Sequence, residues 1–438
     1  MSSREEDLNI PASSDPRVVV LGAGFGGLTF VRKFRNSGYQ VVLIDRNNFH
    51  QFQPLFYQVA MAGLEPSAIA FPIRKVFQKR ENVFVRQAEI LEVDPEERLV
   101  VTDRGNVQFD FLVIGIGAVT NFFNNEAIAQ KSYSLKTLGE SLGIRNRIFE
   151  DFEESLMSRN YNDRQKLIDF VIVGGGPTGV EMAGALAEMK RYIIPKDYRE
   201  LDPGEVDIYL VQSGEHLLPG MRPESQQRAE RYLSDMGVTL ILNDRVVDYD
   251  GESVFLKNGD PILAEKLIWA AGVRCPEVPG LSGEEQVDNK GRFLVDQHCR
   301  VKGFENIFAV GDIARMDTDD YPYGHPQVAQ VALQMASYVA SFLDKRGHSK
   351  EKKPFVYKDK GALATIGRNK AVADLPRFSL GGFLAWLIWL WVHLYALIGT
   401  RNKLIVVINW MWNYFTYDTA LRLIIKQKGN SAEAKQES

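Results

Sequence analysis

The sequence predicts an α/β fold with two Rossmann-like domains and a C-terminal amphipathic helical segment. Two glycine-rich loops predict the domains, because each follows a β-branched run and precedes a helical stretch: Gly22–Gly27 and Gly174–Gly179. The C-terminal segment is indicated by a sharp rise in aromatic and apolar content between residues 379 and 425, where five of the six tryptophans fall. Both features bear on what the chain binds.

The composition narrows the class of protein. At 438 residues the chain exceeds one ordinary core, and about 150 residues per domain predicts two to three domains. The net charge of -4 gives no electrostatic footprint for nucleic acid, so we expect no nucleic-acid partner. The only two cysteines, Cys275 and Cys299, form no CxxC motif, which disfavours a disulfide framework and a thiolate metal site and points to a reducing compartment. We expect no metal.

The first strand begins at Arg17 in RVVVLGAGFGG, and a second strand, YQVVLID, ends at Asp45. The same order recurs in DFVIVGGGPTGVE and EVDIYLVQ. Residues 99–118 and 253–272 also correspond, since each contains a strand, a turn and an apolar strand that runs into glycine. We therefore expect an internal duplication of nucleotide-binding units, and so two nucleotides.

The first loop has the pattern of a pyrophosphate site. Gly22, Gly24 and Gly27 permit a tight turn, close approach of main-chain N–H groups to the anion, and close packing of the helix on the strand. Gly26 lies in the same loop, and Asp45 ends the next strand, where it can accept hydrogen bonds from ribose hydroxyls. The loop, the spacing and the terminal acid together predict a dinucleotide site.

The second loop repeats Gly174, Gly176 and Gly179 in the same register, and Glu181 lies just inside its helix. The residue at the end of the next strand is Gln212 rather than an acid. A carboxylate there would bond two ribose hydroxyls and repel a 2′-phosphate, whereas glutamine does neither strongly, so NADPH stays open beside NADH. Considered alone, Glu181 is an ordinary acid of a first helical turn.

A third glycine motif, in which a glycine directly precedes an acid, lies in Ala309–Asp312. Gly311 and Asp312 follow a buried-looking strand, and such a carboxylate can bond the ribityl chain of a flavin, although the pair also suits a simple turn with a helix cap. A helix from about Val328 to Leu343 follows, with Gln330 and Gln334 spaced four residues apart on one face. Spacing alone allows either a polar helix face or a pair of donors to a carbonyl ligand.

These residues resemble a family, the type II (alternative) NADH:quinone oxidoreductases of the two-dinucleotide-binding-domain flavoprotein superfamily. The resemblance covers nearly the whole chain. The motifs that carry it are GAGFGG, FQPLFYQVA (52–60), GGGPTGVE, WAAGV, AVGDIA and AQVALQ (329–334). Val328 departs from the threonine that relatives often carry there, and Gln212 departs from the usual acid.

The resemblance implies FAD in the first unit, NADH in the second with NADPH possible, and membrane quinone, ubiquinone or menaquinone, as acceptor. It implies that Ala329 and Gln330 contact FAD, that quinone approaches near Gln330 and Gln334, and that Glu181 lies near the flavin and nicotinamide and assists proton movement. The implied catalytic residues are thus Glu181, Gln330 and Gln334. It also implies a respiratory-chain enzyme that does not pump protons, attaches to one membrane face and dimerises.

This interpretation divides the chain into parts. The expected ranges are a disordered tail 1–15, FAD-binding parts 16–125 and 276–375, an NAD(P)H-binding domain 126–275, membrane-anchoring helices 376–426 and a disordered tail 427–438. A charged linker is expected at 344–353.

The C-terminal segment is expected to form two helices in the membrane interface. Residues 380–399 lack formal charge apart from His393 when it is protonated, and about 20 residues can reach across the hydrocarbon core, so a spanning helix is physically possible. The many tryptophans and tyrosines, together with Arg401, Lys403 and Arg422, favour a monotopic arrangement over a span or a buried dimer interface. The expected location is the cytoplasmic face of the bacterial inner membrane.

Two other functions use the same flavin machinery. A soluble NAD(P)H:ferredoxin or rubredoxin reductase would leave the aromatic segment without a role. A sulfide:quinone oxidoreductase, like a disulfide reductase, needs redox-active cysteines that this chain lacks. A nucleotide-sensing protein without enzymatic activity could also keep both nucleotides.

Overall fold

The computed structural model describes residues 7–283, 285–344, 353–418 and 421–425. The chain divides into two compact units, each built from three stretches of sequence. The first unit contains Met1–Gln51, Ala70–Thr120 and Val273–Lys360, and the second contains Phe52–Ile69, Asn121–Gly272 and Gly361–Ser438. Residues 361–375, expected with the flavin domain, therefore cluster with the second unit.

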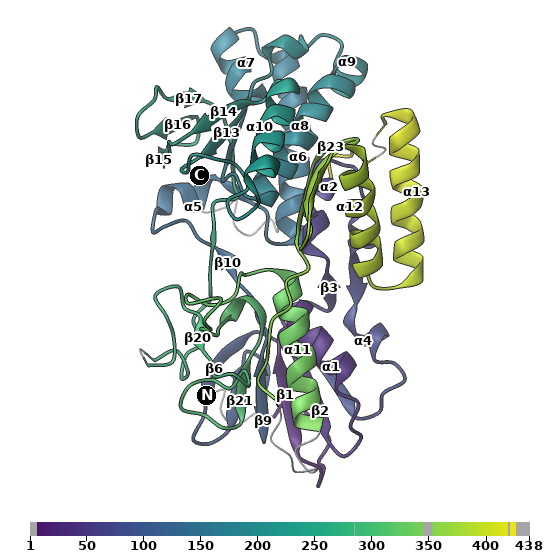
Figure 1. Ribbon diagram of the computed structural model, residues 1–438. Helices are drawn as coiled ribbons and strands as arrows, with labels where there is room; N and C mark the ends of the chain where they lie inside the picture. The colour runs from purple at the N-terminus through teal and green to yellow at the C-terminus, as the bar shows by residue number, and fades with distance from the viewer. Residues whose placement is uncertain (1–6, 284, 345–352, 419–420, 426–438) are drawn as a thin grey trace, which may run out of the picture. The chain divides into compact units, whose positions relative to one another are not determined.

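The first unit contains a parallel sheet of the order β21-β9-β1-β2-β5. Its strands are short apolar runs, and most of their side chains are fully buried, as strands covered on both faces require. Helices α1 and α11 pack against each other in this unit (Figure 1). The bounds are β1 Arg17–Leu21, β2 Gln40–Asp45, β5 Val83–Gln87, β9 Phe111–Ile114, β21 Ile307–Ala309, α1 Phe25–Lys33 and α11 Ala329–Asp344.

The second unit repeats this arrangement in the order β11-β18-β12-β13-β14. In each unit the strand before the glycine loop lies in the middle of the sheet, and the strand that follows the glycine-loop helix lies next to it. The duplication predicted from the sequence is confirmed. The bounds are β11 Tyr133–Ser134, β12 Phe170–Val173, β13 Ile208–Gln212, β14 Thr239–Leu242 and β18 Lys266–Trp269.

Each unit also carries a small antiparallel sheet of three strands, which accounts for the second pair of matching segments. The first comprises β6 Ile90–Asp94, β7 Leu99–Thr102 and β8 Gly105–Gln108, and the second comprises β15 Val246–Tyr249, β16 Ser253–Leu256 and β17 Ile262–Leu263. Short two-stranded pairs complete the first unit: β3 Phe49–Gln51 with β4 Ala70–Pro72, β10 Val119–Thr120 with β19 Val273–Arg274, and β20 Phe293–Leu294 with β22 Ala314–Arg315.

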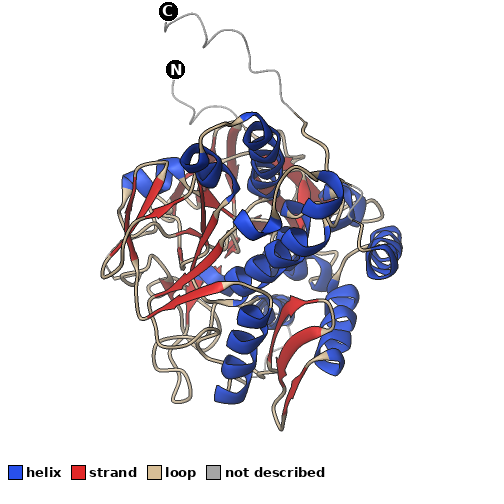
Figure 2. Ribbon diagram, turned by 90° about the horizontal axis from the view of Figure 1, so that it is seen from above, coloured by secondary structure: helices blue, strands red, loops and turns tan. Residues whose placement is uncertain are grey.

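Helices of the second unit are set by local signals in the sequence. The longest, α6 (Leu138–Met157), begins with a capping box: the Thr137 side chain accepts from the Glu140 N–H at 3.1 Å, and the Glu140 carboxylate accepts from the Thr137 N–H at 2.7 Å. Helix α8 (Pro177–Tyr192) begins with proline at a position where no N–H is needed. Figure 2 distinguishes these helices from the strands by colour.

The remaining helices are shorter. They are α2 Phe56–Ala60, α3 Pro66–Ile69, α4 Ile73–Val76, α5 Glu126–Lys131, α7 Tyr161–Ile168, α9 Ile194–Asp197 and α10 Pro223–Asp235, with the 3-10 turns η1 Gln53–Leu55, η2 Pro203–Glu205 and η3 Gly311–Ile313.

The C-terminal part of the second unit is a three-stranded antiparallel sheet followed by two helices. The strands are β23 Ala362–Gly367, β24 Lys370–Asp374 and β25 Ser379–Gly381, and the helices are α12 Phe383–Ala396 and α13 Thr400–Thr416. The two helices lie side by side and turn at Gly399, which has a φ of 84° (Figure 1). The expected helical segment is confirmed. None of the described helices combines the length and the apolarity that crossing a bilayer requires.

The N-terminal segment differs from the expected loose tail. From Asp7 onward it packs on the first unit, where Leu8 and Ile10 are each only 6% exposed. The Arg86 guanidinium donates hydrogen bonds to the carbonyls of Leu8 and Asn9 at 2.8 and 2.5 Å. The burial of these two apolar side chains holds an otherwise polar segment against the first unit. The predicted tail 427–438 and nearly all of the predicted charged linker lie outside the described residues.

Candidate active site

The first glycine loop leaves no room for side chains at two of its glycines. Gly22 has a φ of +89°, and a Cβ there would lie 2.7 Å from the Gly115 carbonyl oxygen. A Cβ on Gly27 would lie 1.8 Å from the Gly22 carbonyl oxygen. By contrast, the nearest atom to a Cβ on Gly24 is 3.8 Å away, so a side chain there would make only ordinary van der Waals contact. The packed glycines shape the turn, and the open one borders the room that a pyrophosphate needs.

Asp45 holds this loop from the end of β2. Its Oδ2 accepts a hydrogen bond from the Ala23 N–H at 2.6 Å, and its Oδ1 accepts from the Asn47 N–H at 2.7 Å. Burial raises the pKa of Asp45, and the two main-chain donors act in the opposite direction. Each carboxylate oxygen keeps a second lone pair for a ribose hydroxyl.

The second loop repeats the geometry. A Cβ on Gly174 would lie 2.6 Å from the Ala270 carbonyl oxygen, and one on Gly179 would lie 1.9 Å from the Gly174 carbonyl oxygen. Nothing lies within 4 Å of a Cβ on Gly176. The middle glycine of this loop, like Gly24, therefore has no protein atom crowded against it, so both loops fit a dinucleotide.

Gln212 occupies the place that Asp45 has in the first unit. Its Oε1 accepts a hydrogen bond from the Gly175 N–H at 2.9 Å. A neutral amide therefore performs the structural task of the acid without adding a negative charge beside the loop.

The first unit brings Gly26, Gly311 and Asp312 together. A Cβ on Gly26 would lie 3.0 Å from a methyl group of Val310, at the end of β21. Gly311 has a φ of +81°, and a Cβ there would lie 2.8 Å from the Cβ of Ala332 on α11. The glycine loop, the Gly311–Asp312 turn and the first turn of α11 thus lie in one region.

The two glutamines predicted to bind quinone both lie on α11, whose first residue is Ala329. The Gln334 side-chain amide is engaged at both ends by Lys358: Nε2 donates to its carbonyl oxygen and Oε1 accepts from its N–H, both at 3.0 Å. Gln330 is half-buried. Both residues belong to the first unit.

Cys275 and Cys299 are both buried free thiols. The Cys275 Sγ donates to the Asp312 carbonyl oxygen at 3.2 Å, which also accepts from the Gln327 side chain at 2.9 Å. The two cysteines of the chain therefore form no disulfide with each other.

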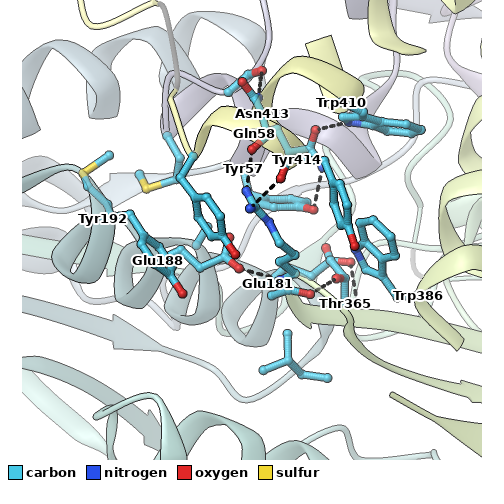
Figure 3. A pocket seen from close by; sticks show the side chains of 18 of the residues that line it. Tyr57, Gln58, Glu181, Glu188, Tyr192, Thr365, Trp386, Trp410, Asn413 and Tyr414 are labelled. Atoms are coloured by element: carbon cyan, nitrogen blue, oxygen red, sulfur yellow. Dashed lines mark hydrogen bonds between the residues drawn. The ribbon is translucent and has the colours of Figure 1, made fainter. Parts of the chain in front are cut away.

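A cavity of about 170 Å³ lies within the second unit (Figure 3). Its wall comes from α2, α8, β23, α12 and α13, which are far apart in the sequence. Residues of these elements, or directly after them, that line it are Tyr57, Gln58 and Met61; Glu181, Ala185, Glu188, Met189 and Tyr192; Thr365, Ile366, Gly367 and Arg368; Trp386, Trp389 and Leu390; and Trp410, Asn413, Tyr414, Tyr417 and Asp418. The lining is rich in aromatic side chains and includes three carboxyl groups.

Glu181 is the acid at the inner side of this cavity. Its Oε1 accepts hydrogen bonds from the Trp389 indole N–H at 3.2 Å and from the Thr365 main-chain N–H at 3.4 Å. Burial raises the pKa of Glu181 to about 8, although both hydrogen bonds lower it. The carboxyl group is therefore mainly protonated at pH 7, where it can donate as well as accept.

The second acid, Glu188, lies seven residues, or about two helical turns, further along α8. Its Oε1 accepts from the Arg368 N–H at 2.5 Å, and burial raises its pKa. The Arg368 guanidinium reaches across to α13, where it donates to the carbonyls of Asn413 and Tyr414 at 2.5 and 2.9 Å. It also lies 3.5 Å from the centre of the Tyr417 ring. The β23–β24 turn thereby fixes the C-terminal end of α13.

A chain of three side chains lines another wall. The Trp410 indole N–H donates to Gln58 Oε1 at 2.8 Å, and Gln58 Nε2 donates to the Tyr57 hydroxyl at 2.8 Å (Figure 3). Burial, and then the nearby Glu181 charge, raise the pKa of Tyr57 well above its ordinary value. Tyr57 is therefore a neutral phenol throughout the physiological range.

The aromatic residues of the C-terminal helices divide into two groups. One group points inward: Trp389 is 1% exposed, His393 stacks on it with ring centres 4.1 Å apart, and Trp386 stacks on Tyr414 at 5.5 Å. Burial lowers the pKa of His393 to about 4, so the histidine that could have carried a charge is neutral. The sequence analysis attributed the tryptophans and tyrosines of these helices to the membrane interface, whereas the inward group packs within the protein.

The other group is exposed on the outer faces of α12 and α13. Trp391, Tyr395, Trp412 and Phe415 are 57–76% exposed, and with them lie the exposed side chains of Phe383, Leu384, Leu387, Leu404, Ile408 and Met411. So many exposed apolar side chains on two neighbouring helices are uncommon on a protein that faces water alone.

Sequence reasoning placed Glu181 in the site but missed its neighbours. Tyr57 and Gln58 stood inside the FQPLFYQVA motif, which was used for the resemblance and not for the site. Trp389 and Trp410 carried no signal that separated them from the other tryptophans, because a helix of nearly uniform hydropathy does not show which face is buried.

Comparison with known families agrees with this architecture. The model of the pyridine nucleotide-disulphide oxidoreductases matches residues 16–336, and the NDH2 C-terminal domain matches residues 360–416. The second match covers the β23–β25 sheet and both C-terminal helices.

Curated relatives are similar over most of their length. The chain is 34% identical to the type II NADH:quinone oxidoreductase Ndh of Mycobacterium tuberculosis over 427 residues, which is 94% of this chain and 90% of the relative. It is 34% identical to NdhA of the same organism, with 90% of this chain and 86% of the relative covered. A solved structure of NDH2 from Plasmodium falciparum in complex with NADH has the same fold, with a TM-score of 0.86 at 23% identity, and the match covers 94% of this chain and 100% of that one.

Proposed function

The chain belongs to the type II NADH:quinone oxidoreductases, and from that membership we propose that its quinone headgroup binds in the cavity between α2, α8, β23 and the two C-terminal helices. It is an FAD-dependent enzyme that oxidises NADH and reduces quinone without pumping protons. The proposal concerns where the quinone lies and which side chains meet it.

The observation that carries the proposal is the buried carboxyl group of Glu181 in a cavity rich in aromatic side chains. A quinone is a flat ring with two carbonyl acceptors, so it needs apolar or aromatic contact on its faces and a few donors at its edge. Trp386, Trp389 and Tyr414 supply the rings, and Glu181 supplies a donor that stays protonated at neutral pH.

The nucleotide loops supply binding and orientation. Main-chain N–H groups after Gly22 and the first turn of α1 are suited to the pyrophosphate of FAD, with Asp45 toward the adenosine ribose and Gly311–Asp312 toward the ribityl chain. The second loop is suited to NADH in the same way. Bound FAD supplies the acceptor for hydride and passes on two electrons.

Within the cavity, Glu181 holds a proton on its carboxyl group. Reduction of a quinone to a quinol consumes two protons, so an acid that is still protonated at pH 7 is placed to supply one. Trp389 and Thr365 both donate to its Oε1, and its Oε2 accepts no hydrogen bond from the residues that the structure describes, so Oε2 is the oxygen that we expect to approach the ligand.

The predicted roles of Ala329, Gln330 and Gln334 are kept as part of the proposal. Ala329 and Gln330 open α11 beside Gly311, which supports a flavin contact. For Gln334 the double hydrogen bond to Lys358 offers an alternative, purely structural role. Gln330→Ala and Gln334→Ala variants with unchanged quinone affinity would remove both residues from the quinone site.

The exposed faces of α12 and α13 support attachment to one membrane leaflet. Their apolar side chains would enter the acyl region while Arg401 stays at the headgroups. We expect the protein to attach to the cytoplasmic face of the bacterial inner membrane. We also expect it to form a homodimer. Light scattering of the purified enzyme in mild detergent determines the oligomeric state.

One assay tests the proposed site. Titration of the purified FAD-loaded enzyme with a short-chain ubiquinone and a menaquinone analogue should quench tryptophan fluorescence, because Trp386, Trp389 and Trp410 line the cavity. A Trp386→Phe variant should lose part of this quenching. Quinone binding that leaves the fluorescence of all three tryptophans unchanged would place the quinone elsewhere.

A further inference from the structure

The chain of hydrogen bonds from Trp410 to Tyr57 has a fixed direction. An indole N–H only donates, so it must meet the oxygen end of the Gln58 amide, as the 2.8 Å contact to Oε1 shows. The NH₂ end of the same amide then has to face the Tyr57 hydroxyl, which it does at 2.8 Å. A tryptophan on α13 thereby fixes the orientation of an amide on α2.

The consequence concerns the phenolic proton. Since the Tyr57 oxygen already accepts from Gln58, its own O–H must point along another direction. No acceptor for this proton lies among the described residues, although Tyr57 is only 7% exposed. A buried tyrosine hydroxyl normally donates to a partner, and Tyr57 is one of the residues that line the cavity.

The acceptor is therefore expected from a ligand. Tyr57 is held neutral, as is Glu181 at pH 7, so this wall of the cavity presents two donors and no fixed negative charge in that range. Two donors beside aromatic rings suit a ligand with carbonyl oxygens. The guanidinium of Arg368, which also lines the cavity, already donates to the carbonyls of Asn413 and Tyr414, and this favours a neutral carbonyl ligand over an anion.

We propose that the Tyr57 hydroxyl donates the hydrogen bond to a carbonyl oxygen of the bound quinone, and that Gln58 and Trp410 aim it. The inference rests on the proposed quinone site and adds the residue that recognises the carbonyl. Tyr57 touches the substrate, and Gln58 and Trp410 are positioning residues that act only through it. The C-terminal helix α13 thus takes part in quinone recognition through one indole N–H.

The test uses the FAD-loaded enzyme and three variants: Tyr57→Phe, Trp410→Phe and the double variant. Tyr57→Phe removes one oxygen and keeps the ring, and we expect the KM for a short-chain ubiquinone to rise about five- to tenfold, since one buried hydrogen bond is lost. Trp410→Phe should raise it about threefold in the wild-type background. In the Tyr57→Phe background it should add nothing, because there is no hydroxyl left to aim.

A second readout separates this effect from a folding defect. The rate at which NADH reduces the flavin, followed by stopped flow, should be the same in all three variants, and so should the flavin content. Tyr161→Phe on α7, where the ring is 57% exposed, is the matched control and should leave the quinone KM unchanged.

Three results would overturn the inference. A Tyr57→Phe enzyme with the wild-type KM would show that the hydroxyl does not meet the quinone, while the proposed site could still stand through its other residues. An equal effect of Trp410→Phe in both backgrounds would show that the indole acts by packing and does not aim Tyr57. Failure of quinone to bind the wild-type cavity at all would reject the proposed site and the inference together.

Discussion

The indole N–H of Trp389 donates to the carboxyl group of Glu181 at 3.2 Å, across a separation of 208 residues in the sequence. Glu181 lies on the helix that follows the second glycine loop, and Trp389 lies on the first C-terminal helix. The contact therefore joins the nucleotide-binding fold to the C-terminal domain that is characteristic of this family. It also explains how an acid can be buried there without a cationic partner.

The raised pKa of Glu181 predicts how stability changes with pH. The pKa of Glu181 is about 8 in the folded protein and 4.5 for an ordinary glutamate, so the folded state binds more protons between these values. The contribution of Glu181 to stability is fully present below about pH 4.5 and is lost as the pH rises toward 8. The loss is at most about 1.4 kcal/mol for each pH unit.

The Glu181→Gln variant isolates this effect, because other raised carboxyl groups, such as Asp169, are present in both proteins. The Tm of the wild type relative to Glu181→Gln should fall between pH 5 and pH 8. A constant difference across this range would mean that Glu181 titrates normally. Quinone reduction by the variant should be slower at pH 7, while flavin reduction by NADH keeps its rate.

Gln212 predicts the choice of nicotinamide nucleotide. Its neutral amide already bonds the Gly175 N–H, so Gln212→Glu can keep that contact and add a negative charge near the expected 2′-position of the adenosine ribose. We expect kcat/KM for NADPH to fall at least about tenfold relative to NADH, since a desolvated like-charge pair costs more than 1.4 kcal/mol. An unchanged NADH/NADPH ratio would show that the 2′-position lies away from residue 212.

Substitution of two glycines in the first loop should cause two different defects. In Gly27→Ala the new methyl group collides with the Gly22 carbonyl oxygen, so the loop must deform and the protein should lose stability as well as FAD. In Gly24→Ala the methyl group meets no protein atom closer than 3.8 Å, so the fold should survive and FAD affinity should fall. Gly38→Ala, whose methyl group would meet only the Asn36 side chain, is the control.

Flavin absorbance and the Tm of the apoprotein distinguish these outcomes. Wild-type FAD affinity in Gly24→Ala would show that the pyrophosphate does not approach this glycine.

The outer faces of the C-terminal helices predict membrane binding. Replacing Trp391 and Phe415 by serine removes two side chains that are 66% and 76% exposed, and co-sedimentation with anionic lipid vesicles should fall at least about tenfold. The matched control replaces Met157 and Tyr161, which are 83% and 57% exposed on other helices of the second unit. Equal losses in both double variants would mean that the C-terminal faces have no special role.

Much of the fold followed from the sequence because it depends on local signals. The β-branched runs, the glycine spacing and the repeat of both predict two equivalent sheets, and the structure has them. The docking of Leu8 and Ile10 was not foreseen, since two apolar residues give too little periodicity to indicate an element.

The candidate site was predictable only in part. Glu181 became a candidate only through the resemblance to the family, because an acid in the first turn of a helix is ordinary by itself. Its partners Trp389 and Tyr57 come from segments whose packing depends on long-range contacts, and neither hydropathy nor spacing shows which rings of a uniformly apolar helix turn inward. Gln334 shows the converse, because a residue that the motif indicates makes its contacts with the main chain of Lys358.

The central claim is that two glycine-lined loops hold a flavin and a nicotinamide nucleotide, and that electrons leave to a quinone. Anaerobic mixing of the purified, FAD-reconstituted enzyme with NADH, followed by addition of a short-chain ubiquinone, tests it most directly through the flavin absorbance. The account predicts loss of the oxidised flavin band with NADH and its return with the quinone. A protein that stays colourless after reconstitution with FAD, or a reduced flavin that no quinone reoxidises, would contradict it.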